Sequence, residues 1–229
     1  GENFRARNHL ETAAKKAPGE PAVWANRGLI DLRTRKYETA AQYLERARGL
    51  APDHGPIQYL SGLLAREQGE YEQSIAYLRR AAELDSTNRR AVYTLAQVIE
   101  QRGGEGATTE ALQLMDRLLR LEPGNVAVLV ERARLAAKGG HTEGLREAVE
   151  QLADHASTWP ESVQQSFRDV QDVMGTPSKA ASTVAFLKND LKRVEAYQAD
   201  RQVVQPSGEQ LGSVLARPLR LQAPDSRPA

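Results

Sequence analysis

Several residue types and patterns are missing from this 229-residue sequence, and each absence narrows its function. There is no cysteine, so disulfides, catalytic thiolates and cysteine-ligated zinc are excluded, and the chain fits a reducing or an oxidising compartment. Neither sign of charge dominates: 31 basic and 30 acidic residues leave a net charge of +1, which argues against a dedicated nucleic-acid surface. The longest apolar run, residues 126–130, is far too short to span a bilayer.

Groups that carry catalysis or bind metals are also scarce. None of the histidines has a His, Asp or Glu three or four residues away, the spacing of a metal pair on a helix. These histidines are His9, His54, His141 and His155. The glycines at 103–106 follow no expected strand, so they indicate a flexible turn and not a phosphate-binding loop. We therefore expect no catalytic residue, no metal site, no cofactor and no enzyme activity.

The sequence does contain an internal repeat. Small, apolar and turn residues recur in register, first at steps of 34 residues and then at steps of 37. The columns are Pro18, Pro52, Ser86, Pro123, Pro160; Ala6, Ala40, Ser74, Ala111, Ala148; Leu10, Leu44, Leu78, Met115, Leu152; Ala13, Ala47, Ala81, Leu118, His155; and Gly28, Gly62, Ala96, Ala133. A period near 34 with spacing that fits helices is typical of stacked helical hairpins, which present an extended surface to partners.

Each unit has the pattern of two helices. In the first full unit the expected helices cover residues 21–35 and 37–50, with a proline in the first turn and Pro52 after the second helix. Gly28 and Gly62 lie inside first helices, where glycine costs about 1 kcal/mol of helix propensity. That cost predicts a packing role: without a side chain, the second helix approaches closely and Leu44 or Leu78 fills the space.

The columns also set the boundaries of the expected units. These are residues 1–20, the second helix of an incomplete repeat; 21–54 and 55–88, complete repeats; 89–125 and 126–162, repeats with three-residue insertions, the latter degenerate; 163–204, a capping helix pair; and 205–229, a proline-rich extended tail. The insertions are expected in the turns at 103–108 and 139–143, and the second capping helix at 178–203. Because the chain begins with an unpaired second helix and lacks an initiator methionine, we expect a piece of a longer or processed polypeptide.

As a set, the repeated residues resemble the tetratricopeptide repeat. They are Trp24, Gly28, Tyr37, Ala40, Ala47 and Pro52, then Gly62, Gly69, Tyr71 and Ala81, then Leu95, Ala96, Gly103, Ala111 and Pro123, and last Ala133, Gly140, Ala148, Leu152 and Pro160. The resemblance covers about residues 1–162 and implies an all-α, right-handed superhelical solenoid of stacked antiparallel hairpins, with a C-terminal helical cap and an extended tail. Leu118 and His155 replace small residues, which predicts looser packing in the last two units.

The resemblance also implies a binding surface, because the first helices of such repeats line a concave groove. The expected groove residues are Leu29, Leu32, Arg33, Tyr59, Leu63, Arg66, Arg90, Tyr93, Gln97, Val130 and Arg134. Tyr and Arg are enriched at binding hot spots. An alternative is that Tyr59 and Tyr93 only pack between neighbouring helices.

Two functions follow. The first is a non-enzymatic scaffold that binds an extended segment or helix of another protein in the groove. The second is structural self-assembly, in which the uncovered helix at 1–20 and the apolar C-terminal arm meet head to tail and form rings or filaments. Neither predicts a nucleic-acid partner or a membrane span.

The C-terminal segment carries a second resemblance. The sequence GEQL at 208–211, then LRL at 219–221 and a proline-rich end, is similar to the N-terminal part of large bacterial exported proteins that carry FG-GAP repeats and an ASPIC/UnbV module. This resemblance implies an adaptor arm in a periplasmic or secreted bacterial protein. No signal peptide is visible, so the residues alone leave the compartment open.

Overall fold

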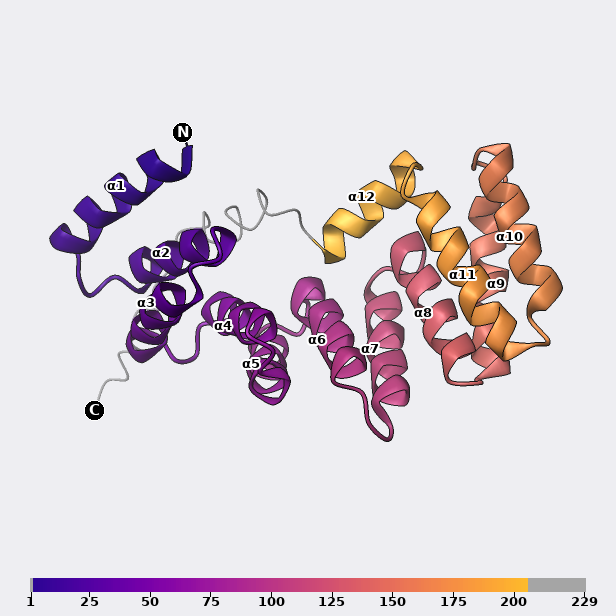
Figure 1. Cartoon of the computed structure of the whole chain (residues 1–229), viewed down its shortest axis with the longest axis horizontal. Helices are drawn as coiled ribbons and strands as arrows, with labels where there is room; N and C mark the ends of the chain where they lie inside the picture. Colours follow the sequence, from indigo (N-terminus) through magenta and orange to yellow (C-terminus); the bar gives the residue numbers. More distant parts are fainter. Residues whose placement is uncertain (1, 206–229) are drawn as a thin grey trace, which may run out of the picture.

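The computed structural model describes residues 2–205, and side chains from Asn8 onward. This part of the chain is helical throughout and contains no strand (Figure 1). Its helices are α1 (Glu2–Lys16), α2 (Pro21–Arg33), α3 (Tyr37–Leu50), α4 (Gly55–Glu67), α5 (Tyr71–Leu84), α6 (Arg89–Arg102), α7 (Ala107–Leu121), α8 (Val126–Lys138), α9 (Thr142–Ala156), α10 (Glu161–Val173), α11 (Pro177–Leu191) and α12 (Glu195–Val204). The expected all-α repeat architecture is confirmed.

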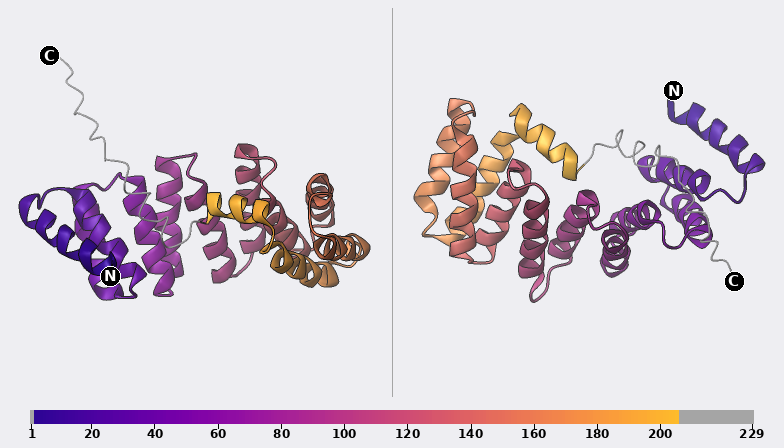
Figure 2. Two further views of the ribbon diagram at one scale, coloured as in Figure 1. Left: turned by 90° about the horizontal axis from the view of Figure 1, so that it is seen from above. Right: turned by 180° about the vertical axis from the view of Figure 1, so that it is seen from behind.

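The helices from α2 to α9 form four hairpins in a row. In each hairpin the first helix (α2, α4, α6 or α8) packs against the second (α3, α5, α7 or α9), and α3, α5 and α7 also pack against the next first helix. The first helices lie in one layer, in which α2 contacts α4 directly. Both views of Figure 2 show the hairpins following one another along an elongated molecule, with α1 at the end next to α2.

The two glycines inside first helices have the expected packing role. A Cβ added at Gly28 would lie 2.6 Å from Cγ of Leu44, and a Cβ at Gly62 would lie 2.7 Å from Cγ of Leu78. Real Cβ atoms do not approach carbon this closely, so any side chain here would displace the leucine or push the hairpin helices apart. The glycine therefore sets the distance between the two helices of a hairpin.

The turns inside the hairpins explain part of the change in repeat length. The turns at 68–70 and 139–141 share one pattern, in which the third residue donates its N–H to a carbonyl five residues earlier. Gly69 and Gly140 supply the positive φ that this turn requires. The turn at 103–106 is one residue longer. The extra residues expected at 139–143 are therefore not found in that turn.

Repeated side-chain contacts fix the start of each hairpin. Trp24 donates its indole N–H to the carbonyl of Pro18 at 2.8 Å, and Gln58 donates in the same way to Pro52 at 2.6 Å. In later hairpins an asparagine caps the first helix: Asn125 Oδ1 accepts from the N–H of Val128 at 3.0 Å. The donor or cap differs between hairpins, but each satisfies polar groups at the loop between two units.

The C-terminal helices depart from the expected pair. The expected helix at 178–203 is interrupted at residues 192–194, so α10 is followed by two helices, α11 and α12. No proline or glycine marks this break. The apolar stripe that ran through the expected helix is buried, but α11 packs it on α8 whereas α12 turns back over α8 and α6. Tertiary packing therefore overrides the helical propensity of the link.

The buried residues form two clusters that meet at α8. One cluster contains residues of α2 to α7, and the other contains residues of α9, α10 and α11. None of the helices in the described part is long and apolar enough to cross a membrane. The expected tail and the segment that resembles FG-GAP proteins, residues 206–229, lie outside the described residues.

Candidate functional site

The expected groove residues all lie on the layer of first helices, but they differ in exposure. The buried ones are Leu29, Tyr59, Leu63, Tyr93 and Val130. The half-buried ones are Leu32, Arg66, Arg90, Gln97 and Arg134, and Arg33 is exposed. The structure thus places the two tyrosines within the packing and the arginines toward the surface.

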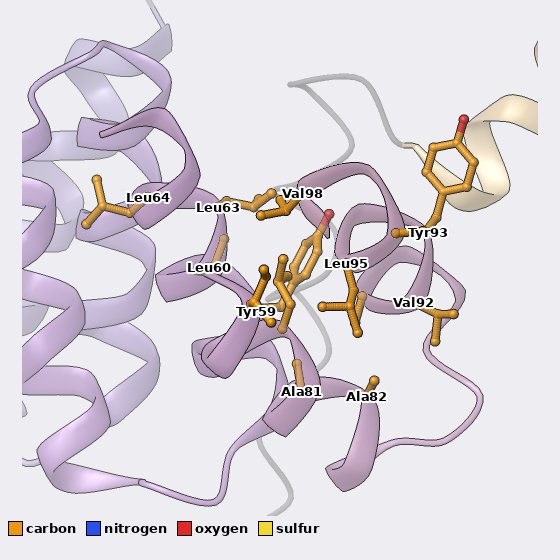
Figure 3. Packing of buried hydrophobic residues seen from close by; sticks show 14 of the residues in the cluster. Tyr59, Leu60, Leu63, Leu64, Ala81, Ala82, Val92, Tyr93, Leu95 and Val98 are labelled. Carbon is orange, nitrogen blue, oxygen red and sulfur yellow. The ribbon is translucent and has the colours of Figure 1, made fainter. Parts of the chain in front are cut away.

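Tyr59 joins two hairpins. Its side chain is 3% exposed, lies between α4 and α6 (Figure 3), and shares a hydrogen bond with Thr94. Burial raises the pKa of the Tyr59 hydroxyl, and the Thr94 hydrogen bond opposes that change in part. The phenol therefore stays neutral, and its contacts are those of a side chain packed between neighbouring helices.

Tyr93 is covered by a helix that sequence reasoning did not place there. It is 3% exposed, and its ring points from α6 toward α12 in Figure 3. Burial raises its pKa, as does the charge of Glu131, and the hydroxyl also lies within electrostatic reach of Tyr197 and Arg201 on α12. Access to Tyr93 therefore requires α12 to move.

The N-terminus of α8 is bound by a carboxylate from α12. The N–H of Val126 donates to Asp200 Oδ2 at 2.8 Å, and the amide of Asn125 donates to the backbone carbonyl of Asp200 at 3.3 Å. Helix N-termini favour negative charge because their first N–H groups lack partners within the helix. Burial raises the pKa of Asp200 although the Val126 hydrogen bond acts in the opposite direction.

A network of charged side chains joins α6, α8 and α11 beside this contact. Arg134 donates to both carboxylate oxygens of Glu100, one of them at 2.8 Å, and Lys138 donates to the same carboxylate at 2.8 Å. Glu131, with a side chain 5% exposed, pairs with Lys188 of α11 at 2.8 Å and with Arg134 at 3.3 Å. Arg134, an expected groove residue, is thus held by two carboxylates of its own chain.

The same layer is more open over α2 and α4. Here Leu32 is half-buried, Arg33 is exposed, and Arg66 is half-buried and paired with the exposed Glu67 at 2.8 Å. The buried Leu29 and Leu63 lie on the same two helices. This part of the face combines an apolar floor with a charged rim.

The opposite layer contains hollows that sequence reasoning missed. One is lined by α3, α4 and α5 and includes Arg48, whose guanidinium contacts the ring and hydroxyl of Tyr77. Another lies among α7, α8 and α9 and includes Arg132 and His155. No group of three or more His, Asp or Glu side chains suited to a metal ion occurs within residues that the structure describes.

These features define a helical-repeat solenoid whose layer of first helices is partly covered by its own C-terminal helix, α12. A family model for the tetratricopeptide repeat matches residues 1–55 and 59–126, more than half of the chain. The chain belongs to the tetratricopeptide-repeat family. No curated protein sequence matches it.

Solved structures of other repeat proteins show the same fold. One from a functional study of Pseudomonas aeruginosa pilF has a TM-score of 0.62 at 18% identity, covering 87% of this chain and 89% of that one. PilW, described as a widely conserved type IV pilus biogenesis factor, has a TM-score of 0.59 at 19% identity, covering 86% and 90%. YrrB, described as a repeat protein with an unusual peptide-binding site, has a TM-score of 0.58 at 16% identity, covering 90% and 96%.

Proposed function

We propose that this chain is a non-enzymatic scaffold that binds a segment of another protein in the groove formed by its first helices. The observation that carries the proposal is the unequal cover of this face. Its C-terminal part, over α6 and α8, packs against α12 and holds internal ion pairs. In its N-terminal part Arg33 is exposed, and Leu32 and Arg66 are half-buried.

The chemistry of the open part indicates the kind of segment that fits it. Leu32 offers apolar contact on α2 next to the exposed Arg33, and Arg66 of α4 is paired with Glu67. Guanidinium groups bind carboxylates through paired hydrogen bonds, so an acidic segment could bind Arg33 and compete with Glu67 for Arg66. A segment with apolar side chains flanked by acidic ones would match both. The peptide-binding description of YrrB supports a protein segment as the ligand class.

A charge-reversal experiment tests this proposal. The wild-type chain, an Arg33→Glu/Arg66→Glu variant and a control Arg120→Glu/Arg168→Glu variant would each capture partners from an extract of the source organism. The control makes the same charge change on exposed arginines of α7 and α10, outside the first-helix layer. We expect one protein to be recovered with the wild type and the control and lost with the groove variant; equal recovery with all three would contradict the proposal.

The second candidate function, self-assembly, has one observation in its favour. Phe186 on α11, near the C-terminal end of the row of hairpins, is 71% exposed. Exposed aromatic side chains of this size contribute strongly to interfaces. Self-assembly through this end predicts a mass that rises with concentration in light scattering and a lower mass for Phe186→Ser. A constant monomer mass for both chains would exclude this candidate.

The proposed location also needs its own test. The resemblance of residues 208–221 to exported FG-GAP/ASPIC-UnbV proteins remains a prediction, and so does a periplasmic or secreted location. Fractionation of source cells with an antibody against the hairpins would place the protein inside or outside the cytoplasmic membrane.

A further inference from the structure

The contact surface of α12 is small and joins the two core clusters. Val204 belongs to the cluster of α2 to α7, whereas Tyr197 belongs to the cluster of α9 to α11. Among the described residues, α8 and α12 are the two helices that contribute buried side chains to both clusters. In Figure 1, α12 is a short helix above α6 and α8, and it packs against both.

Asp200 of α12 accepts hydrogen bonds from Asn125 and Val126 at the start of α8. Asp200 lies on the same face as Tyr197 and Val204, since these residues are three and four positions apart on the helix. Its carboxylate accepts from the N–H of Val126 at 2.8 Å, in addition to the cap that Asn125 already provides to α8. α12 thus supplies an aromatic ring, a carboxylate and an aliphatic side chain to one surface.

Few side chains of α12 are buried. Two of its ten residues, Tyr197 and Val204, are buried, and a non-helical link at 192–194 joins it to α11. Isolated helices shorter than about 12–15 residues are only marginally stable in water, so α12 depends on its packing against α6 and α8 to remain helical. Segments with few buried contacts open more readily than the core beneath them.

We infer that the surface formed by α6 and the first turn of α8 is a helix-binding subsite that α12 fills within the chain. The partner protein displaces α12 with an amphipathic helix of matching chemistry: an aromatic ring, a carboxylate one turn later and a branched aliphatic side chain one turn after that. In this arrangement α12 covers Tyr93, and its own side chains indicate the chemistry of the helix that would replace it. This inference rests on the proposed function in one respect, namely that the partner is a protein segment. It concerns a different part of the first-helix layer, over α6 and α8.

The test supplies α12 as a separate peptide. A fluorescein-labelled peptide of residues 193–205 would be titrated, with anisotropy as the readout, into the full chain and into a full-chain Tyr197→Ala/Val204→Ala variant. We expect the variant to bind at least about tenfold more tightly, because α12 of the wild type competes at a high effective concentration. A control peptide with Asp200→Lys should bind the variant at least about tenfold more weakly than the unmodified peptide, because it lacks the carboxylate for α8.

Hydrogen exchange shows whether the variant has opened as intended. The amides of α12 should exchange faster than in the wild type while those of α6 and α8 keep their protection; if they lose it, Asp200→Lys in the full chain replaces the double variant. Equal peptide affinity for wild type and opened variant, or for the two peptides, overturns the inference. An opened variant that dimerises by exchanging α12 also overturns it, because the occupant is then a second copy. None of these measurements depends on Arg33 or Arg66. A result that contradicts this inference therefore leaves the proposed function standing, and the reverse also holds.

Discussion

Gly62 faces Leu78 at a distance that leaves no room for a methyl group, because an added Cβ would lie 2.7 Å from Cγ of Leu78. Gly28 has the same relationship to Leu44 one repeat earlier. Leu44 and Leu78 are among the most deeply buried side chains of the first core cluster. The close approach of the two helices in the first two hairpins therefore depends on a glycine, in spite of its cost to the helix.

Substitution of this glycine should destabilise the chain. Gly62→Ala forces either a shift of Leu78 or a wider hairpin, and we expect a loss of roughly 1–3 kcal/mol, measured by urea unfolding. Gly49→Ala is the matched control, because Gly49 is exposed within α3 and its added Cβ meets nothing within 4 Å. The control should be stabilised by up to about 1 kcal/mol, through helix propensity alone. Similar effects of both substitutions would contradict this packing role.

Gly62 and Leu78 should also be energetically coupled. Leu78→Ala alone should cost roughly 2–5 kcal/mol because it leaves a cavity in the core. In the Gly62→Ala/Leu78→Ala double variant the added methyl enters that cavity, so the loss should be smaller than the sum of the single losses. A double-mutant cycle by urea unfolding measures the difference, and strict additivity would show that the two sites do not meet.

The ion pairs between α6 and α8 predict a dependence of stability on pH. Burial acts to raise the pKa of Glu100, but the hydrogen bonds from Arg134 and Lys138 outweigh it and lower the pKa from 4.5 to about 2. A carboxyl group with a lowered pKa in the folded state contributes stability above its unfolded pKa and loses it as pH falls toward the folded one.

Glu100→Gln tests this dependence. At pH 7 we expect the variant to be less stable by at most about 3 kcal/mol, since Arg134 keeps its contact with Glu131. The difference from wild type should shrink as the pH falls from 4.5 toward 2, measured by urea unfolding at each pH. A difference that does not change over this interval would show that Glu100 is not held ionised by its partners.

Substitution of a buried tyrosine should lower the stability of the fold, whether or not a partner is bound. Tyr59→Ala removes a large aromatic side chain from between α4 and α6 and should cost roughly 3–5 kcal/mol, as for other buried aromatic residues. Tyr59→Phe removes only the Thr94 hydrogen bond and should cost about 1 kcal/mol. Tyr71→Phe is the control: its hydroxyl bonds to Gln101 at an exposed site, so we expect less than about 0.5 kcal/mol. Thermal melts that show no loss for Tyr59→Ala would contradict the packing role.

The repeat architecture could be predicted from the sequence because it depends on local and periodic residues. Gly28 and Gly62 mark the first helices, and their leucine partners recur at the same step, so helix order and hairpin packing follow from the columns. The fourth unit was harder, because its turn at 139–141 keeps the ordinary length while its second helix runs one residue longer than α5. Since α10 begins 35 residues after α8, whereas α6 begins 34 residues after α4, the fourth unit has one extra residue and not the three that its columns predict.

The cover of α6 and α8 by α12 could not be predicted, because it depends on contacts between distant parts of the chain. The stripe from Val184 to Tyr197 continues at helical spacing through the link at 192–194, and no proline or glycine indicates the break. Only the fit of Tyr197, Asp200 and Val204 against α6 and α8 explains it. Asp200 was not a candidate site residue, since a single aspartate within a helix carries no signal in the sequence.

The most direct test of the scaffold account is site-specific photo-crosslinking. A benzophenone amino acid would replace Leu32 on the first-helix layer or, as a control, Leu121 at the exposed end of α7. Each chain would be irradiated in an extract of the source organism, and its adducts identified by mass spectrometry. The account predicts an adduct with one other protein from position 32 and none from position 121. The same adduct from both positions, or from position 121 alone, would contradict binding in the groove.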